Sequence, residues 1–119
     1  MIMRGHRVIL DSDLAVLYGV ETRRLNEQVR RNLSRFPPDF AFQLTPEEFR
    51  SLISQIATSN VRRRRGGRRK RPYAFTEHGA VMAASVLSSP KAVEMSILVV
   101  RAFVMELADE TDFEGIPVT

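Results

Sequence analysis

Residues 11–32, DSDLAVLYGVETRRLNEQVRRN, place a glycine between two short stretches of helical periodicity. Gly19 can adopt the positive φ that ends a helix and that residues with a side chain resist. Ala15 is small enough to let a second helix cross the first, and Leu25 falls where that second helix would pack back. We therefore expect two helices joined by a turn at Gly19, the arrangement of a helix-turn-helix. The expected buried side is completed by Leu14, Leu17, Val20 and Val29.

The second of these helices is expected to begin near Thr22 as its cap and to end near Asn32, while Asp11 or Ser12 caps the first. Leu25 and Val29 then point inward with i, i+4 spacing. Arginine and asparagine can form paired hydrogen bonds with guanine and adenine edges, and the second helix of such a pair usually enters the major groove of DNA. The residues left on or near the outer face are Thr22, Arg23, Asn26, Glu27 and Arg30.

Positive charge is concentrated rather than spread. Eight of the 18 basic residues lie in residues 62–71, called the basic run here, and the rest of the chain has 10 basic against 14 acidic residues. Such a cluster favours a polyanionic partner. Gly66 and Gly67 divide it into two arms, which a hairpin or a loop without fixed shape would accommodate equally well. The basic residues are Arg62, Arg63, Arg64, Arg65, Arg68, Arg69, Lys70 and Arg71.

The remaining pattern predicts short strands and further helices. Residues 1–10 are expected to form two strands around a turn at Arg4 and Gly5, and a strand at residues 40–44 follows the break at Pro37 and Pro38. Thr45 and Glu48 have the spacing of a capping box, which predicts a helix over residues 46–57. Its expected apolar face consists of Phe49, Leu52, Ile53 and Ile56.

A strand at residues 72–75 and a helix at residues 77–87 capped by Thr76 are expected to follow the basic run. Tyr73 and Phe75 could stack on bases, but their alternating spacing is more typical of core residues. The last predicted helix spans residues 91–107. One of its sides carries Val93, Ile97, Val100, Phe103 and Val104, and further apolar residues lie elsewhere around it.

That last helix is apolar nearly all round between residues 95 and 105. Such a helix is either the central core element or one half of a homodimer interface. Residues 1–108 are therefore expected to form one domain, and residues 109–119 an acidic tail or linker. The fold class expected from these elements is α+β, with a helix-turn-helix-like core and two C-terminal helices.

Several function classes find no support in the composition. The chain has no cysteine, which excludes disulfides and thiolate metal sites. No apolar run is long enough for a membrane span and no signal peptide is recognised, so a cytoplasmic location is expected. His6 and His78 have no further ligand or nucleophile at a recognisable spacing. We therefore expect no metal, no cofactor and no enzymatic activity.

With these residues in view, the chain resembles the ORF6N domain of phage and bacterial proteins, a family related to the KilA-N and BRO-N DNA-binding domains. The resemblance covers RGHRVILDSDLAVLYGVETRRLNEQVRRN, RFPPDFAFQLTPEEF, SLISQIATS and the stretch from Gly66 to Val104. It implies a small α+β module that binds double-stranded DNA. Arg62 to Arg65 depart from the family pattern, and family members usually have a few more apolar residues before Met1, which leaves the pairing of the first strand open. Carried over by position, the DNA-facing residues would be Thr22, Arg23, Arg24, Asn26, Glu27 and Arg30.

The function expected from these observations is sequence-reading DNA binding by a phage or prophage-type transcriptional regulator or antirepressor. One alternative is a protein-interaction module that binds a repressor or a second copy of itself. Another is nonspecific binding of nucleic acid through the basic run alone. For Arg24, Arg31 and Arg35 a purely structural role is also open, as ion-pair partners of Glu21, Glu27 and Asp39.

Overall fold

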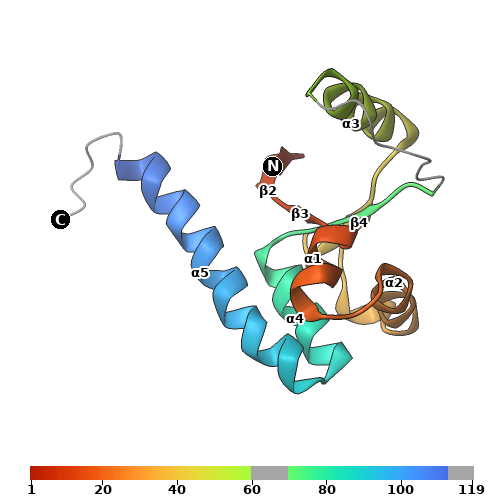
Figure 1. Ribbon diagram of the computed structural model, residues 1–119, viewed down its shortest axis with the longest axis vertical. Helices are drawn as coiled ribbons and strands as arrows, with labels where there is room; N and C mark the ends of the chain where they lie inside the picture. Colours follow the sequence, from red (N-terminus) through yellow and green to blue (C-terminus); the bar gives the residue numbers. More distant parts are fainter. Residues whose placement is uncertain (60–69, 113–119) are drawn as a thin grey trace.

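The computed structural model describes residues 1–59 and 70–112. Within them the chain forms five α-helices, one 3-10 helix and five short strands, which is an α+β architecture (Figure 1). The strands are β1 (Ile2–Met3), β2 (His6–Arg7), β3 (Ile9–Leu10), β4 (Ala41–Gln43) and β5 (Tyr73–Phe75). The helices are α1 (Asp11–Tyr18), α2 (Thr22–Arg31), η1 (Leu33–Arg35), α3 (Pro46–Ser59), α4 (Glu77–Leu87) and α5 (Pro90–Asp112).

The N-terminal hairpin pairs β1 with β2 around the predicted turn. Arg4 and Gly5 both have positive φ, 54° and 81°, as a two-residue hairpin turn requires. The Arg4 guanidinium lies over the ring of Phe42, 3.8 Å from its centroid, and donates two hydrogen bonds of 2.9 Å to Glu48. The hairpin is therefore fixed to both β4 and the start of α3.

Glu48 also completes the predicted capping box. The Thr45 amide donates to Glu48 Oε1 at 2.8 Å, and the Glu48 amide donates to Thr45 Oγ1 at 3.1 Å. Hydrogen bonds from Arg4, and then from the Thr45 backbone, lower the pKa of Glu48 to about 2. The charged form of this carboxylate thus holds the hairpin and the first turn of α3 together.

The central strand β5 divides the hydrophobic core into two clusters. It lies antiparallel between β3 and β4, with Ala74 opposite Leu10 and Phe42, and Phe75 opposite Ile9 and Ala41. Phe75 points into the cluster built with the helices, which confirms it as a core residue, and Ala74 points into a smaller cluster on the other face. The smaller cluster is closed by Val8, Leu44 and Leu52.

The predicted pair of helices is present around Gly19. This residue has a φ of 70° and ends α1, and the amide of Val20 donates back to the Ala15 carbonyl at 3.0 Å. Leu25 and Val29 are buried as predicted. Tyr18 is a buried residue that the pattern did not single out. Its hydroxyl donates to the Ala80 carbonyl at 2.8 Å, and burial raises its pKa to about 12.

Neither of the expected caps of α1 and α2 was correct. The residue at the cap of α1 is Leu10 and that of α2 is Glu21, and neither makes a side-chain capping hydrogen bond. Asp11 and Thr22 are instead the first helical residues. The physical reason for Asp11 is that its side chain is turned into the interior, where other donors bind it.

The apolar faces predicted for α3 and α5 were only partly correct. On α3, Leu52 is buried and Phe49 half-buried, but Ile53 and Ile56 are 45% and 46% exposed. Figure 1 shows α3 standing apart from the other helices, and its contacts with the core are those of Phe49 and Leu52 with the smaller cluster.

On α5 the apolar side grouped from the sequence does not pack as a whole, although Phe103 of that group packs against the core. Ala92 and Val99 are buried and Met95 and Phe103 pack against them, whereas Val93, Ile97 and Val104 are exposed. The helix also extends to Asp112, five residues beyond its predicted end at Leu107. The helix has apolar residues on several sides, so periodicity alone could not select the side that packs on α1 and α4.

The start of α4 is packed directly against the chain before β4. Thr76 caps the helix as predicted, accepting from the Gly79 amide and donating to the Asp39 carbonyl. A Cβ added at Gly79 would lie 1.8 Å from the Phe40 carbonyl oxygen. This position therefore has room only for glycine.

We expect Gly79→Ala to lower the free energy of unfolding by about 3 kcal/mol, because the new methyl group must displace backbone rather than a flexible side chain. Urea denaturation followed by circular dichroism measures this. Ser85→Ala, at an exposed position of the same helix, is the matched control and should change stability by less than about 0.5 kcal/mol. Equal stability of the two variants would contradict the close contact.

Candidate nucleic-acid interface

A buried carboxylate fixes the position of α2. Asp11 is 1% exposed, and its Oδ2 accepts one hydrogen bond from Asn26 Nδ2 at 2.9 Å and another from the Tyr73 amide at 3.1 Å. It lies in the first turn of α1, where the helix dipole favours a negative charge. The three residues come from α1, α2 and β5, so one side chain joins elements separated by up to 62 residues.

This network removes Asn26 from the predicted outer face. The side chain is half-buried and its amide nitrogen is directed to Asp11, while its Oδ1 is buried with no hydrogen-bond partner among the residues that the structure describes. A carboxylate can only accept, so the amide must present its nitrogen there. Asn26 is thus better placed to orient α2 than to contact a base.

The exposed side of α2 carries four arginines around one glutamate. We call this surface the α2 outer face, and it consists of Arg23, Arg24, Glu27, Arg30 and Arg31. The four arginines are exposed and Glu27 is half-buried at its centre. Leu25 and Val29 hold the opposite side of the helix in the core. Thr22 is half-buried at the edge of this surface, beside the turn.

Two of these arginines form exposed ion pairs. Arg23 lies 3.1 Å from Glu21, and Arg31 lies 3.4 Å from Glu27. Exposed pairs of this kind contribute about 0–1 kcal/mol, so an incoming phosphate can replace them at little cost. Arg24 and Arg30 have no ion-pair partner in the part of the chain that the structure describes. The suggested pair of Arg31 with Glu27 is therefore present, but Glu21 pairs with Arg23 rather than with Arg24.

The basic run ends at Arg71, two residues before Tyr73, whose amide binds Asp11. Only its last two residues, Lys70 and Arg71, lie among the described residues, and both are exposed; Arg62 to Arg69 lie outside them, including the turn expected at Gly66 and Gly67. The Arg71 guanidinium donates to the Leu44 carbonyl at 3.0 Å, and the Gln43 side chain donates to the Arg71 carbonyl at 3.1 Å.

These contacts bring α2 and the last two residues of the basic run, Lys70 and Arg71, to one side of the molecule. Asp11 is hydrogen-bonded both to α2 and to the strand that follows the basic run. Figure 1 shows α2 and the beginning of β5 on the same side, with α1 and α4 between them and α5. The arrangement offers a convex cationic helix and an adjacent cationic segment, which suits a polyanion larger than a small molecule.

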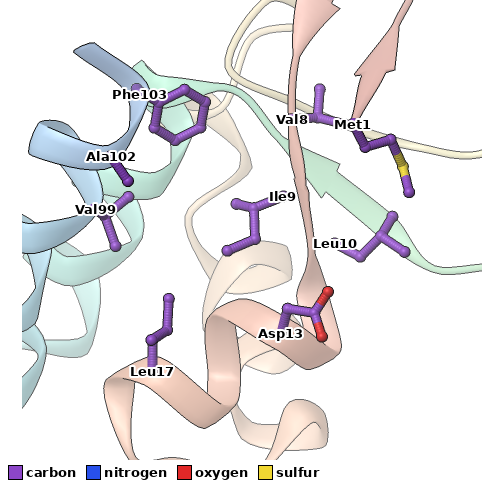
Figure 2. A pocket seen from close by; sticks show the side chains of 9 residues that line it. All are labelled: Met1, Val8, Ile9, Leu10, Asp13, Leu17, Val99, Ala102 and Phe103. Atoms are coloured by element: carbon purple, nitrogen blue, oxygen red, sulfur yellow. The ribbon is translucent and has the colours of Figure 1, made fainter. Parts of the chain in front are cut away.

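One pocket is lined mainly by apolar side chains. It is a cavity of about 280 Å³ and lies where β3, α1 and α5 meet. Figure 2 shows apolar side chains from all three elements around it. Asp13 is the one ionisable side chain in its wall, so the cavity presents no acid–base pair. Its lining consists of Met1, Val8, Ile9, Leu10, Asp13, Leu17, Val99, Ala102 and Phe103.

His6 and His78 both line a second, wider pocket, and no pattern in the sequence indicates that these two residues lie near one another. His78 is exposed and stacks on Phe40 at 5.4 Å between ring centroids. Within residues 1–59 and 70–112, no three His, Asp or Glu side chains gather in a way that could hold a metal ion. No helix in these residues has the length and apolarity needed to cross a membrane.

Comparison with known proteins gives one match. A family model described as the ORF6N domain matches residues 1–86. No curated protein and no solved structure matches the chain. The matched residues include α1, α2 and the basic run, and they end one residue before the end of α4. The resemblance drawn from the sequence extended to Val104, so α5 lies beyond what the family model covers.

We expect Asp11→Ala to lower the free energy of unfolding by roughly 3 kcal/mol, because the Tyr73 amide and the Asn26 side chain both lose their acceptor. Asp13→Ala is the matched control, an exposed carboxylate in the same helical turn, and should cost less than about 1 kcal/mol. Urea denaturation of both variants measures the difference. A similar small effect of the two changes would show that Asp11 does not hold α2 and β5 together.

Proposed function

Because the chain belongs to the ORF6N domain family, a phage-type family, we propose that it binds double-stranded DNA and reads its sequence without catalysing a reaction. The observation that carries the proposal is the α2 outer face, held by the Asp11 hydrogen bonds beside the strand that directly follows the basic run. A regulatory role, as a transcriptional regulator or antirepressor of phage or prophage type, fits such a module. Its place of action would be the cytoplasm.

In this proposal α2 occupies the major groove. Arg24 and Arg30 are exposed and have no ion-pair partner among the described residues, so they are available for guanine O6 and N7. Arg23 and Arg31 can exchange their exposed glutamates for backbone phosphates. Glu27, at the centre of the α2 outer face, would be repelled by backbone phosphates. Its carboxylate can accept a hydrogen bond from the amino group of a cytosine. Asn26 acts through the orientation of α2.

The basic run supplies the part of the affinity that does not depend on sequence. Eight cationic side chains within ten residues can neutralise several phosphates, and each neutralised phosphate releases bound counterions. The Arg71 contact with Leu44 fixes where this segment meets the sheet. Arg62, Arg63, Arg64, Arg65, Arg68, Arg69 and Lys70 would then follow the DNA backbone or enter the neighbouring minor groove.

The first test is selection of binding sites from random duplex DNA, followed by Arg30→Ala on the selected site. We expect a defined motif, and for the variant a loss of about 1–3 kcal/mol together with relaxed preference at one base pair. Arg50→Ala, which removes an exposed arginine from α3, is the matched control and should leave the motif unchanged. Selection without enrichment of any motif would contradict sequence reading and leave nonspecific binding.

The second test replaces Arg62 to Arg65 with serine. Binding to all duplexes should weaken, and the slope of log K against log salt should become less steep by up to about 3.6, since each lost phosphate contact removes about 0.9. Arg30→Ala should change that slope by no more than about 1. Fluorescence anisotropy over a salt series measures both. An unchanged slope in the serine variant would show that the basic run makes no phosphate contacts.

A further inference from the structure

One side of α5 is largely apolar and is not covered by the residues that the structure describes. Ala92 and Val99 are buried against α1 and α4, while Val93, Ile97 and Leu98 are 53%, 53% and 51% exposed. We call this side the α5 outer face, defined by Val93, Glu94, Ile97, Leu98, Arg101 and Val104. Exposed apolar side chains scattered singly are ordinary, but a continuous set along a helix marks a surface that binds something.

The charges on this face are arranged symmetrically. Glu94 lies one turn before the Ile97–Leu98 pair and Arg101 lies one turn after it, so that the pair is the midpoint between opposite charges. Both charged side chains are exposed, and neither has an ion-pair partner in the residues that the structure describes. Two such helices placed antiparallel would bring Glu94 of each against Arg101 of the other.

We propose that the α5 outer face binds the same face of a second copy of this chain, with the two helices antiparallel around a two-fold axis between Ile97 and Leu98. The contact is isologous, as most homodimer contacts are. It places Ile97 and Leu98 at the centre and an intermolecular ion pair on each side. A parallel arrangement would instead place Glu94 beside Glu94 and Arg101 beside Arg101, so that no intermolecular ion pair would form.

The rest of the fold leaves room for this contact. α1 and α4 pack between α5 and α2, so a partner on the α5 outer face does not cover the α2 outer face (Figure 1). The opposite side of α5 faces the rest of the fold, where Val99 and Phe103 pack in the core and line the cavity between α5, β3 and α1 (Figure 2). α5 also lies beyond residues 1–86, so the inference does not depend on the family or on DNA binding.

The inference is tested by sedimentation velocity of the full chain without DNA, over concentrations from low to high micromolar. A contact made by one helix of each copy is small, so we expect a dimer with a micromolar dissociation constant. Ile97→Glu should remove the dimer while circular dichroism remains that of the folded chain, since Ile97 is exposed. Val16→Glu, at a 78% exposed valine of α1, is the matched control and should still dimerise.

Charge exchange tests the antiparallel geometry. Glu94→Arg alone and Arg101→Glu alone should each raise the dissociation constant roughly tenfold, because two attractive pairs become repulsive. The double exchange should restore it to within about threefold of the original, since the pairs re-form with reversed sign. A monomer at all concentrations, a dimer that survives Ile97→Glu, or a double exchange as weak as the single ones would each overturn the proposal.

Discussion

The hydrogen bonds to Asp11 are the constraint on which the arrangement of the candidate surface depends. A buried carboxylate is tolerated only when donors replace the water it loses, and here the donors come from α2 and from the backbone of β5. α2 therefore cannot slide along α1 without breaking the hydrogen bond between Asn26 and Asp11. The same bonds place the strand after the basic run beside α2. The cationic helix α2 and the described end of the basic run, Lys70 and Arg71, thus lie on one side of the molecule.

A second set of polar contacts supports the sheet from the other end. Arg4 reaches from the N-terminal hairpin over Phe42 to Glu48, so the hairpin, β4 and α3 are joined by one guanidinium. In both sets a single charged side chain links elements that are not neighbours in sequence. The strands have only two or three residues each, so their backbone hydrogen bonds alone would hold the sheets weakly. These side chains add the contacts that fix the strands relative to the helices.

Features set by the local chain were predictable from the sequence. Gly19, the capping box at Thr45 and Glu48, and the Thr76 cap each depend on the φ or the hydrogen bonds of a few adjacent residues, and each was confirmed. The α+β class and the inward side of α2 followed from periodicity, since Leu25 and Val29 are separated by a helical turn in an otherwise polar segment.

Features set by distant partners were not predictable. Asp11 was expected to be a cap and Asn26 to lie on the outer face, because nothing near them in sequence indicates that the Tyr73 amide lies within hydrogen-bonding distance. The packed side of α5 could not be selected for a related reason, because a helix that is apolar nearly all round does not indicate which of its sides faces the neighbouring elements. Which residues touch DNA stays a prediction.

A backbone hydrogen bond between Leu44 and Pro72 closes a long insertion between β4 and β5. The Leu44 amide donates to the Pro72 carbonyl at 3.0 Å, so everything between these residues, including α3 and the basic run, is an excursion between two paired strands. The entropy of closing such an excursion grows only with the logarithm of its length, and four inserted residues cost roughly 0.1–0.4 kcal/mol. Residues can therefore be inserted between Leu44 and Pro72 with almost no penalty to the pairing of β4 with β5, so the sheet does not limit how many arginines this part of the chain carries.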